Sequence, residues 1–227
     1  MFFVARVCYI VIMSRILAMC NQKGGVGKST TAQNVAVFLS ALGKKVLLVD
    51  LDSQANTTSG MGFNPRKLEK SLYDVLMNRA TIKEVIKKTK SLNVDLLPAS
   101  SSLAGAGIEL VDMRDREYKL KEALFEVRQH YHFIIIDSPP SLGLLTINAI
   151  TASHKIIIPV QCEYYALEGL ADLLRTIQLV NTNLKTRAGV MGALLTMYDR
   201  KSRLHCAVAK EIRRKFPGYV FNAIIPR

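Results

Sequence analysis

Hydrophobic residues along this chain fall into two patterns, short continuous runs and longer stretches with one apolar face. Apolar runs of about four to eight residues between turn signals predict buried strands. Such runs lie within residues 15–20, 44–52, 92–100, 132–141, 154–161, 188–198 and 219–227. Apolar residues at helical spacing predict amphipathic helices, here at residues 29–43, 116–131, 166–182 and 204–216. Gly43 is a typical C-cap for the first of these helices.

Strands that are apolar throughout, with helices between them, predict the fold class. We expect an α/β fold whose mostly parallel twisted sheet is covered by helices on both faces. A length of 227 residues suits a single domain. Such sheets bind ligands beyond the carboxyl ends of their strands. Polar clusters follow three predicted strands, at residues 21–31, 50–57 and 137–141, and we expect the functional site there.

Charge and cysteine content narrow the class of partner and the compartment. The formal net charge is +13 and the isoelectric point is near 9.7. Such an excess points to a polyanion, either nucleic acid or an acidic membrane surface, with a merely solvated basic surface as the alternative. The four cysteines are widely spaced and form no CxxC pair. This argues against a zinc site or a disulfide framework and favours reduced thiols in the cytoplasm.

The first residues form an apolar stretch that Arg6 and Arg15 interrupt. A cleaved secretory signal would remove the strand that positions the glycine-rich loop at residues 20–31. We therefore interpret residues 1–12 as an upstream extension and residues 13–227 as the domain itself. A membrane anchor is the alternative for this stretch.

The segment "CNQKGGVGKSTT" at residues 20–31 joins a predicted strand to a predicted helix. A glycine-rich turn at that place lets backbone N–H groups converge on an anion at the helix N-terminus. Lys28 is placed to reach terminal phosphates, and the Ser29 hydroxyl to bind Mg²⁺. The segment is a phosphate-binding loop with one departure from the standard form, because Gln22 occupies the position of the first glycine. An ordinary glycine-rich turn is the alternative interpretation.

Three aspartates end the neighbouring strands. Asp50 and Asp52 lie two residues apart, so they share a side if the strand continues to Asp52. Asp137 follows a four-residue apolar run. One carboxylate at such a position typically binds magnesium, directly or through water, and a second orients the attacking water. Helix capping or a solvated strand end is the alternative for either residue alone.

Four segments together resemble the ParA/Soj family of chromosome- and plasmid-partition ATPases, from about Met13 to Arg227. They are "NQKGGVGKSTTAQNVA", "VLLVDLDSQANTTSGMG", "FIIIDSPPSLGLLTINA" and "IPVQCEYYALEGLADLLRTIQLV". The resemblance implies a P-loop ATPase of the deviant Walker A type, with weak ATPase activity, that uses ATP and Mg²⁺. It also implies a homodimer that sandwiches two nucleotides.

The resemblance assigns roles to individual residues. Lys23 matches the signature lysine that reaches the nucleotide of the partner subunit. Asp52 positions the lytic water, which makes Lys23 and Asp52 the expected catalytic pair. Asp137 supports the metal through water and Ser29 binds it directly, while Asp50 supports the site from behind. The expected ATP-binding residues are Lys23, Gly24, Gly25, Val26, Gly27, Lys28, Ser29 and Thr30.

The resemblance also gives the basic end of the chain a role. Family members bind DNA without sequence preference and act with a ParB-like partner. Lys201 matches a DNA-contacting position, and Arg200 and Arg203 are further candidates. These features imply a cytoplasmic, nucleoid-associated protein with no stable membrane association.

Three rival functions remain open. They are a MinD-like division-site ATPase at the membrane, a P-loop enzyme that phosphorylates or ligates a small metabolite, and an iron–sulfur reductase. Among the departures from the family, Ser53 and Ala55 replace a usual proline and glycine, and Ser29 a usual threonine. Relatives continue beyond "IIPR", so we expect residues 13–227 to lack the C-terminal end of the domain.

Overall fold

The computed structural model describes residues 14–227, so the predicted extension at residues 1–12 lies outside the described residues. One eight-stranded sheet has the order β3-β4-β2-β5-β1-β6-β7-β8. The strands are β1 Arg15–Met19, β2 Val46–Asp50, β3 Lys87–Lys88, β4 Val94–Leu97, β5 Phe133–Asp137, β6 Lys155–Gln161, β7 Gly189–Tyr198 and β8 Val220–Pro226. All neighbouring strands are parallel except β3 and β4, which confirms the predicted mostly parallel sheet.

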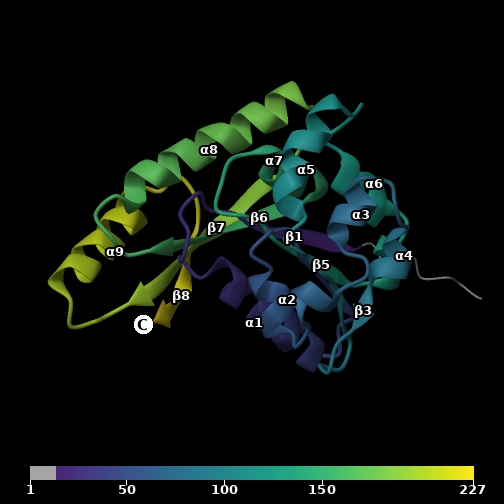
Figure 1. The fold of residues 1–227 in the computed structure, drawn as a ribbon. Coiled ribbons are helices and arrows are strands. Elements are labelled where there is room, and N and C mark those ends of the chain that lie inside the picture. Colours follow the sequence, from purple (N-terminus) through teal and green to yellow (C-terminus); the bar gives the residue numbers. More distant parts are fainter. Residues whose placement is uncertain (1–13) are drawn as a thin grey trace, which may run out of the picture.

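Helices cover both faces of this sheet (Figure 1). Helix α1 and the short α2 lie below the sheet in that view, and α5, α7 and α8 lie above it. The helices are α1 Lys28–Ala41, α2 Asn56–Gly60, α3 Leu72–Leu76, α4 Ile82–Val85, α5 Leu103–Glu109, α6 Lys119–Phe125, α7 Leu144–Ala152, α8 Ala166–Asn183 and α9 Arg203–Lys215. Short 3₁₀ turns occur at η1 Pro65–Lys67, η2 Leu110–Asp112 and η3 Arg128–His130.

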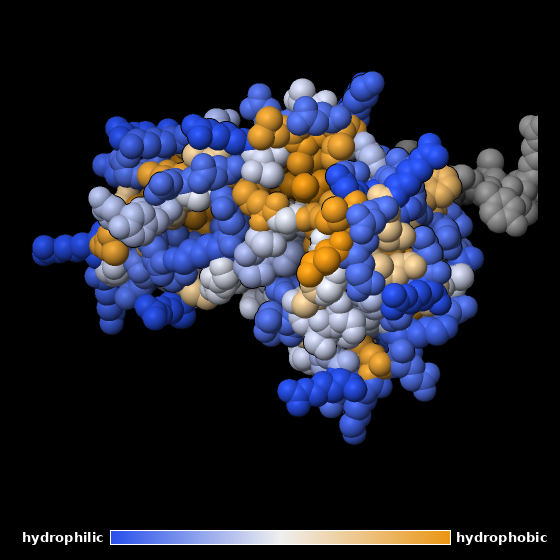
Figure 2. All heavy atoms as spheres, turned by 45° about the horizontal axis from the view of Figure 1, so that its top comes forward, coloured by the Kyte–Doolittle hydropathy of each residue, from blue (hydrophilic) through white to orange (hydrophobic). Residues whose placement is uncertain are grey.

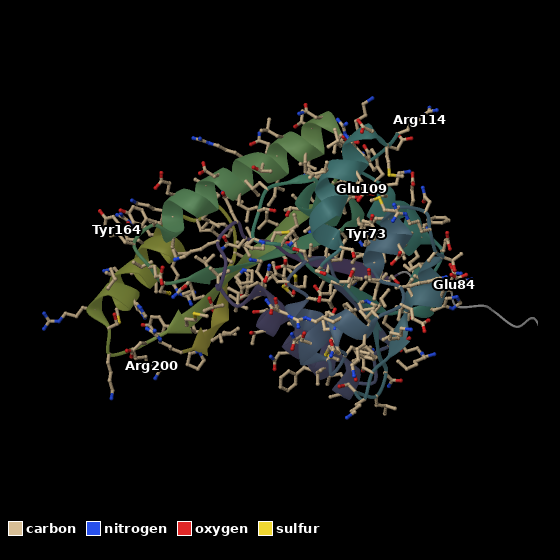
Figure 3. All side chains as sticks on the ribbon, viewed as in Figure 1. Tyr73, Glu84, Glu109, Arg114, Tyr164 and Arg200 are labelled. Carbon is tan, nitrogen blue, oxygen red and sulfur yellow. The ribbon has the colours of Figure 1, made fainter. Side chains whose placement is uncertain are left out.

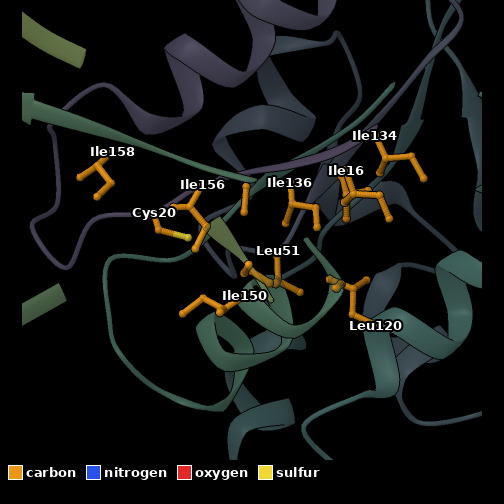
Figure 4. Packing of buried hydrophobic residues seen from close by; sticks show 14 of the residues in the cluster. Ile16, Cys20, Leu51, Leu120, Ile134, Ile136, Ile150, Ile156 and Ile158 are labelled. Carbon is orange, nitrogen blue, oxygen red and sulfur yellow. The ribbon is translucent and has the colours of Figure 1, made fainter. Parts of the chain in front are cut away.

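The core explains why the strands read as continuous apolar runs. Successive side chains of a strand point to opposite faces. Ile134 and Ile136 of β5 pack into the larger cluster, under α5 to α8 (Figure 4). Ile135 packs on the other face, in the smaller cluster beside α1, together with Leu48. Both faces of the central strands are therefore buried, and no polar alternation remains in their sequence, whereas most of β8 is exposed or half-buried.

Helix α1 ends as the sequence predicts, at a left-handed glycine. Gly43 has φ 75°, a conformation that favours glycine. Its N–H donates to the carbonyl of Ser40 (2.9 Å), and the N–H of Lys44 donates to that of Leu39 (3.1 Å). These two bonds form a Schellman motif that satisfies the last carbonyls of the helix.

The surface is uneven in polarity. In Figure 2, apolar side chains gather in the middle of the helical face, while its two ends are mostly hydrophilic. Large exposed apolar residues in this layer include Ile108 and Leu179. Across residues 14–227, no helix is both long enough and apolar enough to traverse a bilayer.

Candidate nucleotide site

The glycine-rich loop between β1 and α1 is fixed by its backbone conformation and by β7. Gly25 and Gly27 have φ 73° and 84°, which residues with a side chain rarely adopt. The Thr196 hydroxyl of β7 donates to the carbonyl of Val26 (2.9 Å). Pro140 lies beside Gly24, at the distance where a side chain at that position would make ordinary van der Waals contact. The turn predicted from Gly24 to Gly27 is therefore present and held from two sides.

The N-terminus of α1 opens onto this turn. Gly27 is the N-cap residue and provides no side-chain cap, and the first turn contains no acidic residue. The first N–H groups of a helix have no partner within it and carry about half a positive charge. Ser29 is half-buried and Thr30 is exposed at this end. The arrangement is suited to an anion such as a phosphate.

The two lysines of the loop serve different places. Lys28 is buried, and its Nζ donates to the carbonyl of Lys23 (3.0 Å). Burial lowers the pKa of Lys28, and the charges of Asp137 and Asp52 oppose that shift. The Lys23 side chain is 54% exposed and forms an ion pair with Glu163, just after β6. Lys28 therefore contacts the loop itself, whereas Lys23 contacts a residue outside it.

Two fully buried carboxylates lie side by side at the carboxyl edge of the sheet. Parallel pairing puts Asp50 of β2 in register with Asp137 of β5. One oxygen of Asp137, Oδ2, accepts from the Thr57 hydroxyl (2.7 Å), whereas the buried Oδ1 has no partner. Burial raises the pKa of Asp137, and the neighbouring hydroxyls of Ser29 and Thr57 and the charge of Lys28 oppose that shift. An orphaned carboxylate oxygen near a serine hydroxyl fits a hard cation such as Mg²⁺.

Asp50 holds the segment that follows its own strand. Its Oδ2 accepts from the N–H and the hydroxyl of Thr58 (both 2.7 Å), and its Oδ1 accepts from the N–H of Asp52 (3.2 Å). Burial and the charge of Asp137 raise the pKa of Asp50 to about 7. Strand β2 ends at Asp50, so the condition for Asp50 and Asp52 to share a strand side is not met.

Asp52 nevertheless joins the same cluster. It is 8% exposed, and its Oδ1 accepts from the N–H of Gln54 (3.0 Å). Its charge raises the pKa of both Lys28 and Asp137, which places it near both groups. The structure thus brings Lys28, Ser29, Asp50, Asp52 and Asp137 together at one strand edge.

Comparisons with known proteins agree with this geometry. A family model described as an AAA domain matches residues 14–189. The sporulation initiation inhibitor protein Soj of Bacillus subtilis is 51% identical over 215 residues, which cover 95% of this chain and 85% of that protein. The chromosome partitioning protein ParA of Caulobacter vibrioides is 45% identical, over 94% of this chain and 80% of that protein. The chain belongs to the ParA/Soj family of partition ATPases.

Solved structures extend the likeness to three dimensions. Cobyrinic acid a,c-diamide synthase from Mycobacterium smegmatis, with bound ADP and magnesium, has a TM-score of 0.91 at 40% identity, over 95% of this chain and 87% of that one. A putative plasmid partition protein from Borrelia burgdorferi, bound to AMPPNP, has a TM-score of 0.77 at 30% identity, over 89% of this chain and 81% of that one. The predicted family, sheet class and assignment as an ATPase are thereby confirmed.

The predicted DNA contacts of this ParA/Soj-family chain lie outside the nucleotide cluster. Arg200, Lys201 and Arg203 are exposed where β7 turns into α9, and within residues 14–227 none of them forms an ion pair. The N–H of Lys201 donates to Asp199 Oδ1 (2.8 Å), which fixes the turn. Arg200 is labelled at the lower left of Figure 3, where it lines a pocket together with Ile224 and Arg227. The turn follows the carboxyl end of β7, at the same sheet edge as the loop.

Several residues of the site escaped sequence reasoning. Thr57 and Thr58 bind Asp137 and Asp50 from the start of α2, and Glu163 binds Lys23. Thr57 and Thr58 follow Asp50 and Asp52 by only a few residues. Their hydroxyl groups so close to two aspartates were the feature of the sequence that could have indicated a role in the site. Glu163 is 140 positions from Lys23, so no local pattern points to that contact.

Proposed function

We propose that this chain is an ATP-dependent dimerisation switch with weak ATPase activity, acting in chromosome or plasmid partition. The observation that supports this most is the division of labour between the two loop lysines. Lys28 lies inside its own cradle, while Lys23 stands at the surface with more than half of its side chain exposed. A second cation that leaves its own site is available to the nucleotide of another protomer.

Within one protomer, each residue of the cluster has a defined task. The loop N–H groups from Gly24 to Thr30 and the Lys28 ammonium hold the phosphates of ATP. Ser29 would bind Mg²⁺ directly and Asp137 would support it through water, and the ion would supply positive charge to the phosphate oxygens. Asp52 accepts a hydrogen bond from the attacking water and orients it.

Dimerisation follows from electrostatics at the interface. Two triphosphates brought close together repel one another unless fixed cations stand between them. Lys23 of each protomer provides such a cation to the other's nucleotide and stabilises charge on the leaving oxygens. Hydrolysis followed by release of inorganic phosphate removes the charge that Lys23 binds, and the dimer then separates.

DNA binding completes the switch. Arg200, Lys201 and Arg203 contact phosphates without reading sequence, so affinity should fall steeply with salt. A dimer doubles the number of these contacts, which links ATP loading to DNA binding. A ParB-like partner stimulates hydrolysis, and the DNA-bound protein is cytoplasmic and nucleoid-associated.

Co-sedimentation tests this proposal against the membrane alternative. The protein is mixed with duplex DNA or with anionic vesicles, with and without ATP, and its oligomeric state is followed by size-exclusion chromatography. We expect an ATP-dependent dimer that sediments with DNA and not with vesicles. Sedimentation with vesicles alone would favour the MinD-like function.

One structural neighbour is named as an amide-forming synthase, and this favours a second candidate function. In that case phosphate would pass to an acceptor carboxylate and not to water. Product analysis of ATP turnover separates the two functions. Release of inorganic phosphate at the same rate with and without candidate carboxylates supports the switch.

A further inference from the structure

A basic cavity lies at the amino edge of the sheet, opposite the nucleotide cluster. Its volume is about 760 Å³, and its lining includes Lys45, Lys83, Lys88 and Lys90 together with His130. Lys45 precedes β2, Lys83 belongs to α4, Lys88 ends β3, and Lys90 lies in the connection from β3 to β4. Figure 1 shows β3 and α4 together at the right-hand end of the molecule. The phosphate loop and its aspartates lie at the other ends of the same strands.

The charges of this cavity are largely uncompensated. Asp95 is the one acidic residue in the lining. Its Oδ2 accepts from Lys88 Nζ and from the Tyr131 hydroxyl, both at 2.8 Å. Within residues 14–227, Lys45, Lys83 and Lys90 form no ion pair, and residues 1–13 contain no aspartate or glutamate. Three exposed ammonium groups thus remain to bind an anion from solution.

The positive edge continues beyond the cavity along the neighbouring strands. Arg15 begins β1, Arg128 precedes β5 and Lys155 begins β6, and all three are exposed. Burial, and then the charges of Arg128 and Lys121, lower the pKa of His154 at this edge. Its Nδ1 accepts from the N–H of Ile16 (3.0 Å), as a neutral imidazole does.

The shape of this surface matches an extended ligand. From β4 through β2, β5 and β1 to β6 there are four strand intervals, or about 19 Å at a typical strand spacing. Duplex DNA presents roughly one phosphate per 1.7 Å of its axis, so about 11 phosphates lie along that length. Exposed lysines bind phosphates as point charges and without sequence preference.

We propose that the amino edge, centred on the cavity lined by Lys45, Lys83 and Lys90, is a second binding surface for the backbone of duplex DNA. It rests on the proposed function in taking DNA as the polyanion. It differs from the surface at Arg200–Arg203 in position, because it lies at the opposite edge of the sheet. A protomer with two such surfaces contacts DNA through both ends of its sheet.

Charge reversal tests this surface on the full chain. Binding to a mixed-sequence duplex of about 30 base pairs is measured by fluorescence anisotropy at several salt concentrations, with and without ATP. The variant Lys45→Glu/Lys90→Glu should bind at least about tenfold more weakly in both conditions. Its log–log salt slope should fall by about 1.8, the loss of two phosphate contacts. The matched control, Arg114→Glu/Arg175→Glu, makes the same charge change at side chains 97% and 81% exposed elsewhere and should stay within about twofold.

The outcomes separate this inference from the proposed function. DNA-independent ATP hydrolysis should be unchanged in both double variants, which verifies folding. Equal losses in the two double variants would show a general charge effect and overturn the amino-edge surface. If only Arg200→Glu/Lys201→Glu loses DNA binding, the amino-edge surface is also overturned, but the proposed function is not affected. If the unaltered chain binds no DNA, both the proposed function and the amino-edge surface are wrong. If Lys45→Glu/Lys90→Glu loses binding to phosphatidylglycerol vesicles and not to DNA, the amino edge is a membrane contact.

Discussion

The carboxyl edge of the sheet holds buried acidic residues, whereas the amino edge holds exposed basic residues. At the carboxyl edge, Asp50 and Asp137 are fully buried and adjacent, and burial raises the pKa of both. At the amino edge, Lys45, Lys83 and Lys90 are exposed and solvated. Buried like charges are costly unless a cation or a proton joins them, whereas exposed charges cost little. The carboxyl edge is therefore incomplete without a ligand, and the amino edge is stable with or without one.

The largest expected effect is a loss of ATP affinity from a substitution at the carboxyl edge alone. Lys28→Ala removes the cation of the phosphate cradle, and two lost charge-assisted hydrogen bonds correspond to about a hundredfold or more in ATP affinity. Isothermal titration calorimetry with Mg·ATP measures this loss. The matched variant at the other edge, Lys45→Ala, should bind ATP like the unaltered chain. Similar losses in the two variants would contradict the separation of the edges.

The next effect separates binding from turnover within the carboxyl edge. Asp52→Ala should retain ATP affinity but slow hydrolysis about a hundredfold or more, the usual loss for a positioned base. The dimer should then persist in size-exclusion chromatography with ATP, because the charge that Lys23 binds is not removed. A normal rate of phosphate release in Asp52→Ala would reject the assigned role.

Much of the carboxyl edge was predictable because its parts follow apolar runs. The glycine loop, Asp50 and Asp137 each end a buried strand, and parallel pairing then brings them to one edge. The unpredicted parts lack such a signal. Strand β3 consists of Lys87 and Lys88, which pair with β4 through backbone bonds and not through an apolar pattern. Helix α7 has apolar residues on nearly all sides, which hides the helical period.

The site residues also divide into those that follow an apolar run and those that do not. Asp137 is recognisable because it follows "FIII" directly, and the register between β2 and β5 then places it beside Asp50. Thr57 and Glu163 reach the site by tertiary contacts from α2 and the end of β6. The basic cavity at the amino edge also combines segments far apart in sequence, because Lys45 and Lys90 precede different strands. Charge alone indicated a polyanion, and only the fold shows which surface faces it.

A smaller effect concerns the pH dependence of stability in the absence of nucleotide and metal. Asp50 keeps its proton up to about pH 7 in the folded chain but loses it near its ordinary value of 3.8 when unfolded. The free energy of unfolding should therefore fall between about pH 4 and 7, by on the order of 4 kcal/mol from this group. Asp50→Asn should flatten that part of the curve, measured by urea unfolding.

The control for this experiment is an exposed aspartate. Asp115→Asn changes a side chain that is 58% exposed and should leave the pH dependence unchanged. Asp50→Asn loses the acceptor for the N–H of Asp52, which lowers stability by about 1 kcal/mol at every pH. A slope that is the same in Asp50→Asn and in the unaltered chain would show that Asp50 is ionised throughout this range.

The smallest expected effect concerns the contact that holds Lys23 on its own protomer. Lys23 and Glu163 are 54% and 40% exposed, and exposed ion pairs contribute about 0.2–1 kcal/mol. Glu163→Gln removes the pair and leaves Lys23 free to reach the nucleotide of a second protomer. Each of the two protomers breaks one such pair, so ATP-dependent dimerisation should then tighten by up to about thirtyfold, as measured by analytical ultracentrifugation. Glu168→Gln makes the same change at an exposed position in the first turn of α8 and should leave the dimerisation constant unchanged. A weaker dimer in Glu163→Gln would show that Glu163 supports the contact between protomers and does not restrain Lys23. In that case the exposed Lys23 alone, without restraint by Glu163, sets how readily a second protomer completes the nucleotide site at the carboxyl edge.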